Sequence, residues 1–181
     1  MKSRSSMFLI ALASAVALVA FAADASAQWS VEGRVGSAIP TGELTEPGLD
    51  QTGGVSFAAE GMYTFRPNLS VYGGASRQRF NCDGCAADVS STGLNGGLKY
   101  VFLPSASAFP WVRGGLMVHQ PAVAGDARDW GVGLDSAVGV DWEVTESTAV
   151  VPAVRLNTYS SGPLSVRYVT IDLGVHMHPG Q

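Results

Sequence analysis

The sequence predicts an all-β protein: an eight-stranded antiparallel up-and-down transmembrane β-barrel, preceded by a cleavable signal peptide. Three observations support this prediction. Residues 165–177 alternate apolar and polar side chains with a period of two, which is typical of a β-strand. Similar segments recur about seven more times, and the connections between them differ in length in a regular way. Charged residues make up only 14% of the 181 residues, against about 25% in an average soluble domain.

Residues 1–27 have the three parts of a signal peptide. Lys2 and Arg4 give a positively charged start, residues 7–22 are apolar, and Ala25-Ser26-Ala27 forms an A-x-A cleavage site. A membrane anchor is the alternative interpretation, but the apolar run is short for a spanning helix. We therefore expect an exported protein with a single domain, residues 28–181.

Eight segments have the strand pattern. They are residues 29–39, 54–65, 69–80, 89–102, 111–120, 130–143, 148–159 and 165–177. Pro152 interrupts the seventh, and a proline in a central strand argues against that assignment. The second and sixth connections are tight turns, whereas the first, third and fifth are long and polar. Bacterial outer-membrane barrels have short periplasmic turns and longer external loops, so the connections favour this class.

Each strand has one apolar face and one face that collects polar side chains. The ionisable residues with this inward parity are Glu32, Arg34, Glu60, Lys99, Arg113, His119, Asp135, Asp141, Arg155, Asp172 and His176. An eight-stranded barrel is narrow enough for side chains to fill, and buried charges must be paired. We expect a lumen closed by ion pairs, with Asp135–Arg155 as the first candidate and Asp172–Arg34 as the second.

Two other architectures remain as alternatives to this closed lumen. A solvated ion pore would use the same charges, and a soluble β-sandwich would have the same strand period. The sandwich is disfavoured because its outer face would be polar.

The aromatic residues give a separate indication of a membrane position. Six of them, Trp29, Tyr63, Phe65, Tyr100, Phe102 and Trp142, have apolar parity at the end with the short turns. This placement predicts an interfacial girdle. Trp111 lies at that end with inward parity. Phe80, Tyr159 and Tyr168 have inward parity toward the opposite end.

Few motifs suggest chemistry. Cys82-Asp83-Gly84-Cys85 is a C-x-x-C motif in a loop, and in an exported protein we expect Cys82 and Cys85 to form a local disulfide. His176-x-His178 is weak evidence for a metal site. His119 lies near the external rim without an evident serine and acid beside it. We expect no catalytic residue, no cofactor, no metal and no nucleic-acid partner.

The chain resembles the small outer-membrane β-barrel proteins of the OmpA/OmpX/opacity type. The resemblance rests on the first strand GRVGSAIPTGEL, the hairpin GVDWEVTESTAVVPAVRLNTY and the closing strand, and it covers about residues 28–177. It departs at His178-Pro179-Gly180-Gln181, where the family usually ends in an aromatic residue. The family implies membrane insertion and roles in adhesion, envelope integrity or narrow porin activity.

The lead hypothesis is a non-enzymatic structural or surface-interaction protein. A narrow porin, a lipid A-modifying barrel enzyme and a soluble lipocalin-like barrel are the alternatives. A lipocalin-like lumen would be apolar, whereas the charges here share the inward parity.

The outer rim suggests partners. The long loops contain seven acids, Glu43, Glu46, Asp50, Asp83, Asp88, Asp126 and Asp129, against the single base Arg128. Divalent cations could bind there, since hard cations prefer carboxylate oxygens. Arg77, Arg79 and Arg167 have lipid-facing parity just inside this rim, where guanidinium groups suit lipid phosphates. We expect a monomer in contact with outer-membrane lipid and lipopolysaccharide.

Overall fold

The computed structural model describes residues 28–41, 51–82, 89–103, 107–162 and 164–178. Their main strands are β1 (Gln28–Pro40), β2 (Gln51–Arg66), β3 (Leu69–Cys82), β4 (Val89–Val101), β5 (Ala108–Val123), β7 (Gly131–Thr145), β8 (Thr148–Ser161) and β9 (Leu164–Met177). A two-residue strand, β6 (Asp126–Ala127), pairs with the end of β5. No helix in these ranges is long and apolar enough to span a membrane. The predicted signal peptide lies outside the described residues.

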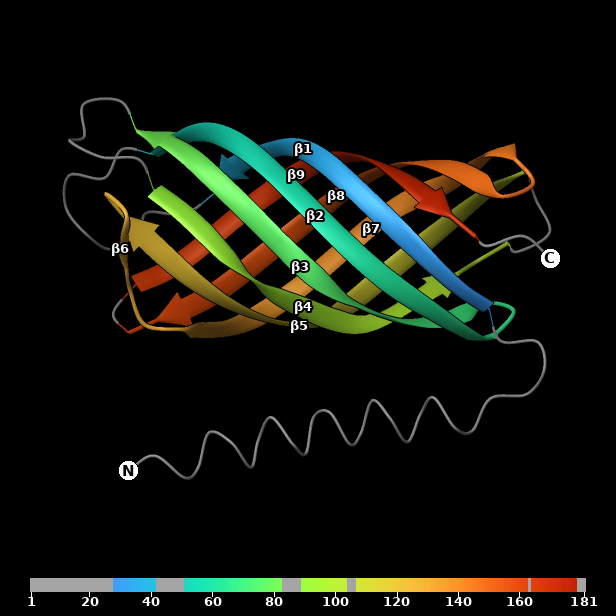
Figure 1. Cartoon of the computed structure of the whole chain (residues 1–181), viewed down its shortest axis with the longest axis horizontal. Coiled ribbons are helices and arrows are strands. Elements are labelled where there is room, and N and C mark those ends of the chain that lie inside the picture. The colour runs from blue at the N-terminus through green and yellow to red at the C-terminus, as the bar shows by residue number, and fades with distance from the viewer. Residues whose placement is uncertain (1–27, 42–50, 83–88, 104–106, 163, 179–181) are drawn as a thin grey trace, which may run out of the picture.

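The eight long strands close into one antiparallel barrel (Figure 1). Each pairs with its neighbour in the chain, β1 pairs with β9, and β4 pairs with β5. Closure removes the free sheet edges that would otherwise expose backbone donors and acceptors. The predicted all-β, eight-stranded up-and-down barrel is therefore confirmed.

The two ends of the barrel can be told apart by their connections. β1 starts and β9 ends beside the short turns 67–68 and 146–147, at the right of Figure 1. The end of β1, the start of β2, the end of β3, the start of β4 and the hairpin of β5 with β6 lie at the other end. Short turns mark the periplasmic end of such barrels, so we call the end that holds residues 28 and 178 the periplasmic mouth.

The strand ends differ from prediction at the connection after β5. Residues 121–129, expected to form a loop, instead extend β5 to Val123 and form the hairpin with β6. Ala124 and Gly125, with φ of 56° and 89°, make the two-residue turn. Positive φ at both central positions is what tight hairpin turns require. The outer end of the wall is therefore longer here than the sequence pattern indicated.

Pro152 is accommodated inside β8 and does not end it. It faces outward and pairs in register with Leu173 of β9. On its other side, the β7–β8 ladder has pairs at Gly139↔Ala153 and Trp142↔Val150 but none between them. Because proline has no N–H to donate, the ladder is interrupted there while its register is kept.

The wall has an apolar outside and a polar, filled inside. Large hydrophobic side chains such as Leu116, Val132 and Trp142 are 62–63% exposed on the outer face. Trp29, Phe65, Tyr100, Phe102 and Trp142 form the exposed girdle at the periplasmic mouth, whereas Tyr63 is buried beside Trp29, with ring centroids 4.8 Å apart. Trp111, Phe80, Tyr159 and Tyr168 are buried in the lumen, as their parity predicted. This is the polarity of a barrel whose solvent is lipid.

Glycines make room for the large side chains of the lumen. Five large inward residues each lie directly opposite a glycine on the next strand: Arg34↔Gly174, Glu60↔Gly74, Trp111↔Gly139, His119↔Gly93 and Tyr159↔Gly133. In each pair, a Cβ on the glycine would collide with the large side chain or the backbone beside it. Small residues facing large ones let a narrow barrel fill its interior without gaps.

We predict that Gly93→Ala lowers the free energy of unfolding by about 1–3 kcal/mol, the usual cost of overpacking. The new methyl group would meet the His119 ring and the carbonyl of Val118. Gly33→Ala is the matched control, because nothing lies within 4 Å of a Cβ there. Urea unfolding in lipid vesicles, followed by tryptophan fluorescence, measures both. Equal effects of the two substitutions would contradict the packing argument.

Candidate functional site

The centre of the lumen is organised by one carboxylate, Glu60 of β2. Its Oε2 accepts a hydrogen bond from Arg113 Nη1 at 2.6 Å, and its Oε1 accepts bonds from Asn95 Nδ2 at 2.6 Å and from Arg34. Arg155 Nη1 lies 3.8 Å from the same carboxylate. The Glu60 side chain has no exposed surface. Such burial is tolerable because the charge is paired and hydrogen-bonded.

A second layer of contacts joins Asp135, Arg155 and Asp172. Arg155 Nη1 lies 3.4 Å from Asp135 Oδ2, and Arg155 Nη2 lies 3.6 Å from Asp172 Oδ2. Tyr72 donates a hydrogen bond of 2.6 Å to Asp135 Oδ1, and Arg113 stacks on the Tyr72 ring at 4.6 Å. The structure thus places Asp135 and Arg155 together, as expected from the sequence, although Asp135 is opposite Asn157 in the ladder.

The predicted Asp172–Arg34 pair is wrong. Arg34 is bonded to Glu32 at 2.8 Å and to Glu60, while Asp172 accepts a bond of 2.8 Å from Thr170 and lies beside Arg155. The physical reason is the register: Arg34 faces Gly174 and Asp172 faces Gly36 across the β1–β9 seam. The Arg34 side chain passes over Gly174, toward the carboxylates of β1 and β2.

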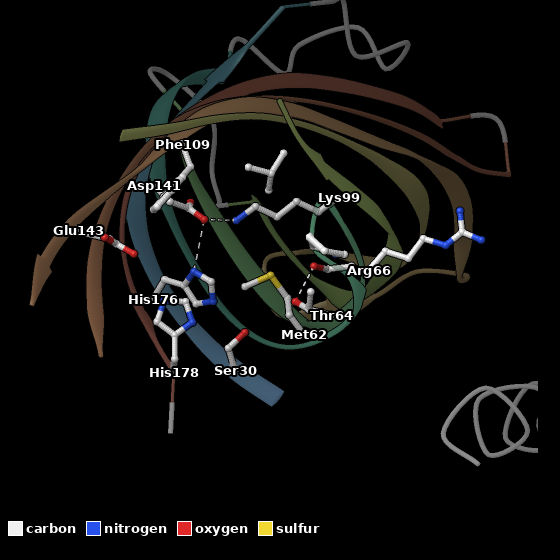
Figure 2. A pocket seen from close by; sticks show the side chains of 13 residues that line it. Ser30, Met62, Thr64, Arg66, Lys99, Phe109, Asp141, Glu143, His176 and His178 are labelled. Atoms are coloured by element: carbon white, nitrogen blue, oxygen red, sulfur yellow. Dashed lines mark hydrogen bonds and ion pairs between the residues drawn. The ribbon is translucent and has the colours of Figure 1, made fainter. Parts of the chain in front are cut away.

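The periplasmic mouth holds a separate group of charges around Asp141 of β7 (Figure 2). Lys99 Nζ donates to Asp141 Oδ2 at 2.6 Å and lies 4.7 Å above the Trp111 ring. Trp111 Nε1 donates to Asp141 Oδ1 at 2.7 Å, and His176 Nδ1 lies 3.4 Å from Asp141 Oδ2. Asp141, Lys99 and His176 border a cavity of about 410 Å³ that also touches His178. Burial, and then the neighbouring His176, lowers the pKa of His178.

The outer end of the lumen is closed by aromatic and apolar side chains. Phe80 and Tyr168 meet edge to face with ring centroids 5.4 Å apart, and Met117 and Tyr159 pack in the same cluster. His119 is fully buried between two serines, with Nδ1 2.9 Å from Ser91 Oγ and Nε2 3.1 Å from Ser76 Oγ. In the described ranges, no hydrogen bond or ion pair joins this ring to a carboxylate.

Several predicted site residues are only partly described. The side chain of Cys82 and all of Cys85 lie outside the described residues, and so do Glu43, Glu46, Asp50, Asp83 and Asp88. The disulfide thus stays a prediction. Asp126 and Asp129 are exposed at the outer end. Arg77, Arg79 and Arg167 are exposed on the lipid-facing side, as their parity predicted.

Two lumen residues were not singled out from the sequence. Tyr72 and Asn95 donate hydrogen bonds to the buried carboxylates of Asp135 and Glu60, as Trp111 does to Asp141. Tyr72 and Asn95 are uncharged, so a search for ion pairs passes over them. Their inward parity was the available signal, because a buried tyrosine, tryptophan or amide normally needs a polar partner.

Comparison with known proteins agrees with this architecture. Residues 8–178 match the outer membrane protein beta-barrel domain family. Among solved structures, Neisserial surface protein A is similar at a TM-score of 0.70 and 17% identity, covering 84% of this chain and 98% of that one. OprG of Pseudomonas aeruginosa is similar at a TM-score of 0.58 and 14% sequence identity. The match covers 86% of this chain and 95% of OprG. The N-terminal barrel domain of OprF from the same organism is similar at a TM-score of 0.51 and 14% sequence identity. The match covers 84% of this chain and 99% of that domain. No curated protein matches.

An apolar belt around a filled eight-stranded barrel defines an integral outer-membrane protein. The chain belongs to the outer membrane protein beta-barrel domain family, because the match spans most of its length. Its location is the outer membrane.

We predict that Glu60→Gln lowers the free energy of unfolding by about 3–5 kcal/mol, because removing one partner leaves buried guanidinium groups uncompensated. Urea unfolding in lipid vesicles measures the loss. Glu143→Gln is the control, since Glu143 is exposed at the periplasmic mouth and surface substitutions change stability by less than about 0.5 kcal/mol. A Glu60→Gln barrel as stable as the wild type would contradict the central role of this carboxylate.

Proposed function

We propose that this protein is a closed, non-enzymatic and monomeric barrel that acts as a structural, lipid-binding component of the outer membrane. The observation that supports this is the filled lumen. The side chains of Arg34, Glu60, Arg113, Asp135 and Arg155 are 0–5% exposed and contact one another across the barrel. A conducting pore would need water beside these charges, so the packing favours a closed barrel over a narrow porin.

The closed lumen predicts that the protein, reconstituted in planar bilayers, gives no stable conductance steps. The aromatic layer at the outer end and the ion pairs beneath it would have to separate before ions pass. Heat-modifiable gel migration of the same preparation verifies that the barrel is folded. Reproducible steps of one size from the folded protein would replace this proposal by the narrow porin.

The outer surface supports a lipopolysaccharide partner. Arg77 and Arg79 are two residues apart on β3 and therefore project from the same outer face, and Arg167 projects outward from β9. A cation facing the middle of the membrane would cost about 2–4 kcal/mol. Near the outer end the same guanidinium groups can form bidentate hydrogen bonds with lipid phosphates. Lipopolysaccharide is the phosphate-bearing lipid of the outer leaflet that these arginines, on β3 and on β9 with β2 and β1 between them, would retain.

We predict that replacing Arg77, Arg79 and Arg167 together with glutamine lowers the lipopolysaccharide that co-purifies with the barrel several-fold. The thermal midpoint should fall in vesicles that contain lipopolysaccharide and stay unchanged in phospholipid alone. Arg66→Gln is the control, an exposed arginine at the opposite end of the wall. Unchanged co-purification in the triple variant would count against this partner.

A further inference from the structure

Three inward side chains from three strands meet at the periplasmic mouth. Glu32 of β1 lies directly opposite His176 of β9 in the antiparallel ladder. Asp141 approaches the same point from β7, on the far side of β8, whose buried Ala149 lies directly opposite His176. All three residues are buried, and one ligand atom from each lies within 4.8 Å of the others. We call Glu32, Asp141 and His176 the mouth cluster.

His176 is the member of the mouth cluster whose ring forms no hydrogen bond in the described residues. It is only 6% exposed, yet neither of its ring nitrogens forms a hydrogen bond within the described part of the chain. Its Nδ1 faces Asp141 Oδ2 at 3.4 Å (Figure 2). Buried polar groups in proteins are nearly always hydrogen-bonded, and an exception needs an explanation such as an absent ion. Because both ring nitrogens of His176 lack a hydrogen bond, we expect a ligand to bind there.

The charge balance of the lumen points the same way. The buried acids Glu32, Glu60, Asp135, Asp141 and Asp172 face the buried bases Arg34, Lys99, Arg113 and Arg155. If the buried His119 and His176 are neutral, the four bases leave one of the five carboxylates without a counter-charge. Burying an unpaired charge is costly, so a positive charge should join this set. The mouth cluster brings two of these acids, Glu32 and Asp141, together with the His176 ring.

We propose that the mouth cluster binds a divalent transition-metal cation of the zinc class. One imidazole and two carboxylates form a mixed nitrogen and oxygen ligand set, which suits zinc and its neighbours in the first row. Calcium and magnesium prefer oxygen ligands alone, so they are disfavoured. His178 can supply a fourth ligand. The ring centroid of His178 lies 4.4 Å from that of His176. The backbone N–H of His178 donates a hydrogen bond to the Ser147 carbonyl at 3.0 Å.

The ligand atoms need only a small movement to close on a metal. Zinc bonds of about 2.0–2.2 Å allow two ligand atoms to be at most about 4.4 Å apart, against the 4.8 Å that bounds the mouth cluster. Lys99 and Trp111 each occupy one oxygen of Asp141, and Arg34 occupies one oxygen of Glu32. Each carboxylate oxygen has a second lone pair, so a cation can share them. The adjacent cavity of about 410 Å³, which Lys99 lines, gives its ammonium group room to withdraw.

The test is zinc binding by the folded protein purified in detergent and stripped of metal with a chelator. Cys82→Ser and Cys85→Ser are present throughout, so that thiols contribute no binding. We expect one equivalent of zinc to bind and calcium at the same concentration not to compete. His176→Gln should weaken zinc binding at least tenfold, His178→Gln by a smaller factor, and Lys99→Gln should strengthen it. Cobalt should give a visible absorption band that His176→Gln removes.

His119→Gln is the matched control, because His119 is also a buried lumen histidine but lies in the outer layer beside serines. It should leave zinc affinity and the cobalt band unchanged. Absence of saturable zinc binding by the wild-type lumen overturns the proposal. So does unchanged binding in His176→Gln, or equal loss in His119→Gln. Heat-modifiable gel migration verifies that each variant is folded. If a variant does not fold, zinc and calcium binding by the protein with an unaltered lumen decides the proposal.

Discussion

The requirement that buried charge be paired governs the interior of this barrel. Eight strands enclose a space too narrow for bulk water, so each ionised side chain that faces inward must find its counter-charge on another strand. Glu60 alone receives contacts from β1, β4, β5 and β8. The rest of the lumen follows from this constraint. Arg34, Arg113 and Arg155 each lie near two or more carboxylates, so the network stays continuous from wall to wall.

The lumen has three layers with different chemistry. Aromatic packing around Phe80 and Tyr168 closes the outer end, the Glu60 network fills the centre, and the mouth cluster with Lys99 faces the periplasm. Each layer contains buried polar atoms without a hydrogen bond in the described residues, among them Asp135 Oδ2 and Asp172 Oδ1 in the centre and the Tyr168 hydroxyl toward the outer end. The periplasmic layer differs because both ring nitrogens of His176 lack a hydrogen bond and because a cavity of about 410 Å³ borders this layer.

Alternation along the strands was enough to predict the fold and the contents of the lumen. A period of two assigns every side chain to one face, so Glu60, Asp135 and Arg155 could be placed inside before any register was known. Register itself was harder. The turn near Thr145 suggested Asp135 opposite Arg155, whereas Asp135 faces Asn157, and the two charges meet diagonally. Across the β1–β9 seam no turn fixes the register, and the pairing of Asp172 was wrong for that reason.

The mouth cluster lay beyond what the sequence could predict. Asp141 and His176 belong to β7 and β9, which are separated by β8, so no ladder pair brings them together. Local spacing drew attention instead to His176-x-His178. Contacts between non-adjacent strands depend on side-chain length and on how deep each residue lies in the barrel. Neither quantity can be obtained from alternation alone.

The pairing of large inward residues with glycines has a consequence for how such barrels diverge. The volume needed at each level of the lumen is shared between two neighbouring strands, and either strand can supply it. A bulky residue and its facing glycine could exchange places over evolutionary time and leave the backbone cylinder intact. Facing interior residues on neighbouring strands would then covary in pairs. Residues on the outer face would change subject only to the requirement that they stay apolar in contact with lipid. A shared backbone with Neisserial surface protein A at 17% identity is compatible with this kind of drift.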